Sequence, residues 1–150
     1  MSNNQPKPDL TKRRRARELA LQILFQREFV PDMDLDASFA YFREQLEFPE
    51  ESWAYAKELI AGLKKHQTDV DQKITTASRN WKIARMSPVD LNLLRIATYE
   101  ILYGNDEVPP KVAIDEALEI AKRYSGTDSP NFINGLLDEI LKSKGLTGGN

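Results

Sequence analysis

The chain has 150 residues and contains no cysteine, so disulfide bonds, thiolate chemistry and cysteine-based zinc sites are excluded. Hydrophobic residues make up 41% and charged residues 29%, a balance typical of a globular domain with one core. Residues 1–17 carry a net charge of +5, which leaves −7 for the remainder. This asymmetry predicts a localised contact with a polyanion near the N-terminus rather than a general coating by nucleic acid.

The sequence shows no sign of membrane insertion or secretion. No apolar run approaches the ~20 residues that span a bilayer, and no apolar segment with a cleavage site follows the basic N-terminal stretch. We therefore expect a cytoplasmic protein without membrane association, and the lack of cysteine fits a reducing compartment.

The first half of the chain predicts helices separated by short loops. Residues 1–10 are polar and are expected to form a disordered basic lead-in to a folded domain over 11–144. The predicted helices are 11–29, 34–47, one that begins at Pro49, and one that restarts near Thr68 and ends near Ser78. The first of these has a narrow polar stripe, so it is expected to be largely buried with its basic first turn projecting from the edge of the core.

The second half carries clearer start signals. Ser87 is a predicted N-cap before Pro88 and Asp90, and this helix is expected to end at Tyr103. An amphipathic helix over 111–124 and a last helix from Asp128 follow, the latter before a flexible tail over 145–150. Because no segment alternates as a strand does, we expect an all-α fold, one compact domain of about seven helices.

Basic residues gather at the start of the first predicted helix. The candidates for phosphate contact are Lys12, Arg13, Arg14, Arg15 and Arg17. Arginine presents a planar fork of donors that matches phosphate oxygens and can also stack on bases. The positive end of the helix dipole disfavours cations at this position, so the cluster favours contact with RNA or DNA. A solvated basic helix end is the alternative for this feature alone.

The last predicted helix carries a second candidate. Phe132 lies at the edge of the apolar arc beside Asn131 and Asn134, where an aromatic ring either packs on the core edge or stacks on an unpaired base. Gly135 follows, and glycine inside a helix costs about 1 kcal/mol relative to alanine. It therefore indicates a close approach, either tight helix packing or a bound ligand.

Other polar residues point to no chemistry. Asn92, Arg95 and Tyr99 share one side of the predicted helix 88–103 and form either its solvent side or a partner surface. His66 is the only histidine and is expected at the surface near a helix end. No metal-ligand set, phosphate loop or nucleophile–base set is suggested, so we expect no catalytic residue, metal, cofactor or enzymatic activity.

Four stretches, taken in order, resemble the NusB family of bacterial transcription antitermination factors. The resemblance covers about residues 11–142, and the region 30–80 matches only in helical pattern. The four stretches are 13–20 (RRRARELA), 94–100 (LRIATYE), 108–117 (VPPKVAIDEA) and 128–138 (DSPNFINGLLD).

The resemblance implies two packed helical bundles within one domain. It implies binding to single-stranded boxA RNA, especially in leaders of ribosomal RNA operons, jointly with NusE, a small-subunit ribosomal protein. The pair would act on the RNA polymerase elongation complex with other Nus factors. By position, the arginine cluster with Asp128, Phe132 and Asn134 would bind RNA. Asp90, Arg95 and Tyr99 would face NusE and the adjoining RNA.

Two alternatives stay beside this prediction. A helical domain of this kind also occurs at the N-terminus of ribosomal RNA cytosine methyltransferases, but 150 residues without an α/β cofactor domain argue against that class. A helical protein-interaction module, with RNA contact secondary, is the other. Self-association as a homodimer that masks the RNA face, the exact RNA and the dominant arginine are left open.

Overall fold

The computed structural model describes residues 10–148 except 80 and 105–106. These residues form no strand, which confirms the predicted all-α class. The helices are α1 (Leu10–Phe29), α2 (Leu35–Gln45), α3 (Glu50–Ser78), the 3₁₀ helix η1 (Ile83–Arg85), α4 (Pro88–Tyr103), α5 (Pro110–Tyr124) and α6 (Ser129–Gly148). Most of the expected lead-in, 1–9, and the final residues 149–150 lie outside the described part of the chain.

Local capping chemistry explains where several helices begin. The Asp34 side chain accepts hydrogen bonds from the backbone N–H groups of Asp36 and Ala37, which opens α2. The Ser87 hydroxyl accepts from the backbone N–H of Asp90 at 3.1 Å, and Pro88 occupies the first turn of α4. The predicted start of this helix is therefore confirmed.

Two predicted helix boundaries are wrong. The expected restart near Thr68 does not occur, because α3 is one helix of 29 residues. Val70 and Ile74 are fully buried and continue the apolar face of Leu63, so packing on this face outweighs the local capping tendency of Thr68. The last helix also continues past Gly145 to Gly148. The structure thus has six α-helices in its described part, not about seven.

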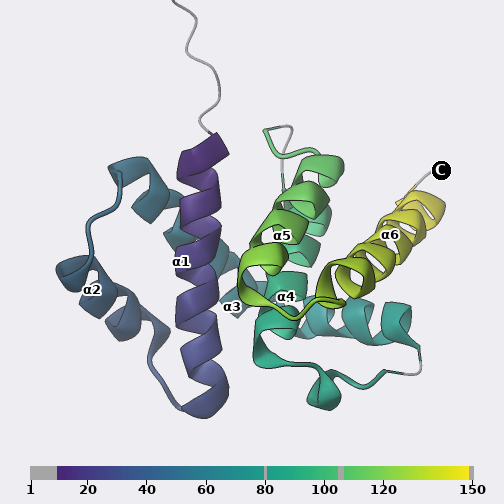
Figure 1. The fold of residues 1–150 in the computed structure, drawn as a ribbon, viewed down its shortest axis with the longest axis horizontal. Helices are drawn as coiled ribbons and strands as arrows, with labels where there is room; N and C mark the ends of the chain where they lie inside the picture. Colours follow the sequence, from purple (N-terminus) through teal and green to yellow (C-terminus); the bar gives the residue numbers. More distant parts are fainter. Residues whose placement is uncertain (1–9, 80, 105–106, 149–150) are drawn as a thin grey trace, which may run out of the picture.

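The helices pack around α4, which is buried on nearly all sides. In Figure 1, α1 and α2 lie on one side of the molecule and α4, α5 and α6 on the other, while α3 runs behind and reaches both groups. The start of α1 consequently lies beside α5. None of the described helices combines the length and apolarity needed to cross a membrane.

The tight core corrects several sequence-based interpretations. Asn92 and Arg95 do not form a solvent-exposed side of α4, because Asn92 is fully buried and Arg95 is 6% exposed. Tyr124, the last residue of the amphipathic α5, is 53% exposed. A Cβ atom added to Gly135 would meet no atom within 4 Å, so tight helix packing does not explain this glycine. His66 lies inside α3 rather than at its end, and its ring stacks on Tyr103 at 3.9 Å between centroids.

Candidate nucleic-acid interface

The arginine cluster is not uniformly exposed. Arg17 is 2% exposed, and its guanidinium donates to both carboxylate oxygens of Glu100 at 2.9–3.1 Å. A carboxylate oxygen of Glu116 lies 3.7 Å from the Arg17 guanidinium. Burial works against the charge of Arg17, but the Glu100 carboxylate outweighs it, so the pKa of Arg17 is raised above its ordinary value. The expectation that the basic turn projects from the core is therefore wrong for Arg17, which points inward toward α4.

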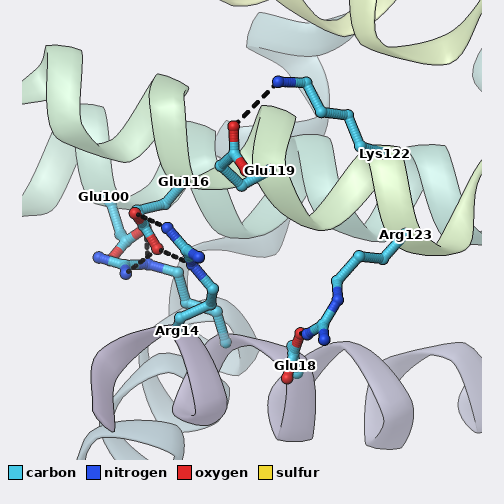
Figure 2. Close-up of polar contacts among 8 residues, drawn as sticks. Arg14, Glu18, Glu100, Glu116, Glu119, Lys122 and Arg123 are labelled. Carbon is cyan, nitrogen blue, oxygen red and sulfur yellow. Dashed lines mark hydrogen bonds and ion pairs between the residues drawn. The ribbon is translucent and has the colours of Figure 1, made fainter. Parts of the chain in front are cut away.

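Two neighbours in the cluster are paired but remain at the surface. Arg14 donates two hydrogen bonds of 2.8 Å to Glu116, whose side chain is 7% exposed, whereas the Arg14 side chain is 37% exposed (Figure 2). Arg13 donates to Glu107 at 2.6 Å and lies over the Tyr55 ring at 4.4 Å. Buried Glu116 thus fixes the direction of the Arg14 fork while part of that fork still faces solvent.

Lys12 and Arg15 complete the basic cluster. Lys12 donates to Glu51 at 2.6 Å, and its backbone oxygen accepts from the Ser52 hydroxyl at 2.7 Å, which joins α1 to α3. Arg15 is exposed, and its guanidinium lies 5.5 Å from the centre of the Phe48 ring. It forms no ion pair with any described residue, so its donors are available to a ligand.

An open cleft of about 630 Å³ separates the start of α1 from the end of α5. Its lining is formed by Thr11, Arg14, Arg15, Glu18, Phe48, Glu119, Lys122 and Arg123. Lys122 donates to Glu119 at 2.9 Å, and Arg123 donates to Glu18 at 2.9 Å across the cleft (Figure 2). These two cations were not among the predicted RNA-binding residues, since the sequence only indicates that they face outward and not that they face α1.

An apolar hollow of about 340 Å³ adjoins this cleft, because both are lined by Glu18 and Phe48. Phe25, Val89 and Tyr124 also line it, and the rings of Phe25 and Tyr124 are partly exposed. Helical periodicity does not indicate this hollow, because residues of α1, α4 and α5 form it together. Cations beside exposed aromatic rings are the combination that binds single-stranded nucleic acid.

The second predicted RNA patch lies at the start of α6. Asp128 and Asn134 are exposed, while Phe132 is half-buried and packs on the core. The Phe132 ring also meets the Trp81 ring edge-on, with centroids 6.2 Å apart. The structure therefore places Phe132 at the core edge with part of its side chain accessible.

The three predicted partner residues on α4 do not form one surface. Asp90 accepts hydrogen bonds from the Ser125 and Ser129 hydroxyls at 2.8 and 2.9 Å, which ties α4 to the α5–α6 connection. Arg95 is enclosed by carboxylates of α1 and α3, with hydrogen bonds of 2.7–3.0 Å. Tyr99 instead faces α3 and lies near His66.

Paired carboxylates account for the buried arginines of the core. Asp71 binds Arg95 through both of its oxygens and Glu28 adds a third contact. Burial alone would lower the pKa of Arg95, but the hydrogen bonds that Arg95 donates to Asp71 raise it above the ordinary value. No group of three or more His, Asp or Glu side chains arranged for a metal ion occurs among the described residues.

The chain is similar to proteins of a known family. The family profile described as NusB matches residues 14–142. The transcription antitermination protein NusB of Bdellovibrio bacteriovorus is 44% identical over 134 residues, which cover 89% of this chain and 98% of the relative. The chain belongs to the NusB family. A second relative, NusB of Trichlorobacter lovleyi, is 44% identical over 85% of this chain and 89% of its own length.

Solved structures show the same fold. NusB of T. maritima superposes with a TM-score of 0.78 at 39% identity, covering 92% of this chain and 93% of that one. A structure of the antitermination factors NusB and NusE in complex with dsRNA superposes with a TM-score of 0.77 at 22% identity, covering 89% and 98%. NusB relatives are transcription antitermination proteins and not enzymes, so the predicted family and the predicted lack of enzymatic activity are confirmed.

Proposed function

We propose that the protein binds single-stranded RNA of the boxA type in the cleft between α1 and α5 and, with NusE, promotes transcription antitermination. The observation that carries this proposal is the cleft itself. Arg14 and Arg15 of α1 line it together with Lys122 and Arg123 of α5. These four cations line one open space, and an aromatic hollow continues from it.

The cations would hold the RNA backbone while aromatic rings contact the bases. Arg15 has free donors and Arg14 is held in place by Glu116, so both suit phosphate oxygens with little ordering cost. Unstacked bases would enter the hollow beside Phe25 and Tyr124. Further along, Phe132 would stack on a base.

Three members of the predicted RNA site would act less directly. Arg17 is buried against Glu100, so we assign it to holding α1 against α4 rather than to phosphate. Arg13 and Lys12 are engaged with Glu107 and Glu51 in the free protein. RNA would have to compete with these exposed carboxylates, which hold their partners weakly in solvent. Asp128 and Asn134, near the start of α6, are exposed groups that would form hydrogen bonds with the RNA.

NusE is the proposed protein partner, and the RNA polymerase elongation complex the proposed site of action. A solved complex of NusB and NusE with dsRNA has the same fold as this chain. Asp90 and Tyr99 are half-buried and retain accessible surface, whereas Arg95 would act by keeping α1, α3 and α4 in register. The negative charge of the chain beyond residue 17 suits a basic partner and would speed association.

A gel-shift titration tests the RNA proposal. Leader boxA RNA is compared with a scrambled RNA, each with and without NusE. We expect the boxA RNA to bind more tightly, and Arg15→Ala to weaken both RNAs because phosphate contacts carry no sequence information. Lys65→Ala, which removes an exposed cation from the middle of α3, is the matched control. Equal binding of all RNAs by wild type and Arg15→Ala would contradict the proposal.

The apolar hollow favours one alternative, a protein-docking module in which RNA is secondary. Phe25 and Tyr124 offer aromatic surface that a partner side chain would also cover. NusE binding that is lost in Tyr124→Ala, together with RNA binding that is unchanged, would support this alternative. Sedimentation of the protein at several concentrations tests for a homodimer.

A further inference from the structure

The connection between α3 and α4 carries a basic, aromatic surface that the proposed function does not use. Arg79, Lys82 and Arg85 are exposed, and no acidic residue occurs from Ser78 to Met86 in the sequence. Trp81 is 50% exposed. The other tryptophan, Trp53, is 3% exposed.

Hydrogen bonds hold the Trp81 backbone, and the Trp81 ring contacts a ring of α6. The Ser78 hydroxyl donates to the Trp81 backbone oxygen at 2.7 Å, and the Trp81 backbone N–H donates to the Ser78 oxygen at 3.1 Å. Its ring meets Phe132 of α6 at an interplanar angle of 61°. Two aromatic rings from segments about 50 positions apart in the chain therefore share one surface.

Charges of both signs lie near these rings, and those on the α3–α4 connection itself are all positive. Arg79 approaches Glu139 at 3.5 Å, with 73% of its side chain exposed. Lys82 and Arg85 form no ion pair with any described residue. Asp128, just before α6, and Asp138 of α6 add exposed carboxylates on the neighbouring segment. Cations beside an exposed ring suit a polyanion that also presents flat groups, and a single-stranded RNA meets both requirements.

A series of contacts links this surface to the hollow beside the α1–α5 cleft. Tyr124 lines the apolar hollow, and the next residue, Ser125, donates to Asp90 at 2.8 Å. Ser129 donates to the same carboxylate at 2.9 Å, and Phe132 lies one helical turn further along α6. The hollow, the start of α6 and the Trp81 ring are thus connected through neighbouring residues.

We propose that Trp81 and Phe132 form a stacking platform, flanked by Lys82 and Arg85, for bases of a single-stranded RNA that extends beyond the α1–α5 cleft. This inference rests on the proposed RNA function. It adds Trp81, Lys82 and Arg85 to the interface and makes affinity depend on RNA length. Stacking on Trp81 would tolerate any base, because every base has a flat aromatic face.

Tryptophan fluorescence offers a direct test in the full-length protein. Leader boxA RNA is titrated into wild type and into Trp81→Phe, which keeps a stacking ring but removes the reporter. Trp53 packs against Phe48 at the cleft and supplies a background signal in both proteins. We expect the difference between the two titrations to show quenching of Trp81 at the same RNA concentrations that saturate binding.

Affinity measurements give a second readout. By fluorescence anisotropy of labelled RNA, Trp81→Ala should bind extended boxA RNA about tenfold more weakly, as expected for loss of one stacked base. Two shorter RNAs are also tested, one trimmed at the 5′ end and one at the 3′ end. The RNA that lacks the bases stacked on Trp81 should bind wild type and Trp81→Ala equally. Lys82→Gln provides a variant with the tryptophan intact and should weaken only the longer RNA. Tyr41→Ala removes another exposed aromatic ring, on α2, and is the control.

The outcomes separate this inference from the function on which it rests. If RNA binds but quenches wild type and Trp81→Phe equally, the platform is overturned and the cleft proposal stands. The same holds if extended RNA binds wild type and Trp81→Ala with equal affinity. A wild-type protein that binds no RNA overturns both. A Trp81→Ala variant that loses NusE but retains extended RNA also overturns the platform and identifies this surface as a protein interface.

Discussion

Arg15 and Arg17 lie two positions apart in α1 yet have opposite surroundings. Arg15 is exposed over Phe48, whereas Arg17 is enclosed and bound to Glu100. We expect Arg17→Ala to lower the free energy of unfolding by about 3–5 kcal/mol, because it leaves the buried Glu100 carboxylate without its cationic partner. Arg15→Ala should change it by less than about 0.5 kcal/mol. Urea denaturation followed by circular dichroism measures both, and equal losses would contradict the assigned roles.

Tyr55, which contacts the same buried Glu100, makes the free energy of unfolding depend on pH. Its hydroxyl donates to Glu100, and burial together with this carboxylate raises the pKa of Tyr55 above its ordinary range. The unfolded chain releases this proton above pH of about 10, whereas the folded chain retains it. Stability present below that pH should therefore be lost as the pH rises further.

Urea denaturation at neutral and alkaline pH tests this expectation against Tyr55→Phe. The variant should lose less stability between the two pH values than wild type. It should not abolish the trend, because the pKa values of Tyr99 and Tyr103 are also raised, the first by burial and the second by a hydrogen bond to Asp69. An identical alkaline loss in both proteins would exclude Tyr55 as a contributor.

At the scale of helices, two glycines inside helices have different neighbours. A Cβ on Gly62 of α3 would lie 2.1 Å from the Tyr99 ring of α4, whereas a Cβ on Gly135 of α6 would meet nothing within 4 Å. We expect Gly135→Ala to raise the free energy of unfolding by about 1 kcal/mol through helix propensity alone. Gly62→Ala must displace the Tyr99 ring and should be less stable than Gly135→Ala by at least about 1 kcal/mol.

Thermal and chemical denaturation of the two alanine variants compares these positions directly. Equal gains would show that the Tyr99 ring moves without cost, and that α3 and α4 are not closely packed at this point. Gly135→Ala also serves the RNA proposal, since a bound RNA that approaches this exposed stretch of α6 would be hindered by the added methyl group while folding improves.

For the whole molecule, the distribution of charge predicts how RNA affinity depends on salt. The chain has a net charge of −2, so attraction must come from the cleft rather than from the overall charge. With about four phosphate contacts, the logarithm of affinity should fall with the logarithm of salt concentration at a slope near −3. Filter binding over a series of KCl concentrations measures this slope.

The same titration with Arg15→Ala should give a slope shallower by about one contact, and the Lys65→Ala control should keep the wild-type slope. Binding that does not depend on salt would rule out a phosphate-directed interface. A slope far steeper than −3 would indicate that Arg13 and Lys12 leave Glu107 and Glu51 to join the RNA, since both exposed pairs are open to exchange.

The sequence alone was sufficient for the helical class, most helix starts and the family. Ser87 and Pro88 open α4 as predicted, since caps and first-turn prolines act over three or four residues. The family likewise follows from the order of four sequence motifs, one in each of α1 and α4 and one at the start of each of α5 and α6. Periodicity also gave the buried faces of most helices, because one side of a helix faces the same neighbour over several turns.

Only the tertiary structure decided which basic residues are available. Arg14 and Glu116 are 102 positions apart, and Arg17 and Glu100 are 83 apart. Whether such pairs meet depends on how α1 packs against α4 and α5, which helical periodicity does not specify. For the same reason the sequence could not place Lys122 and Arg123 opposite the first turns of α1, or Trp81 beside Phe132. Packing between distant segments turned an apparent run of five free cations into one exposed arginine, several internal ion pairs and a cleft completed by another helix.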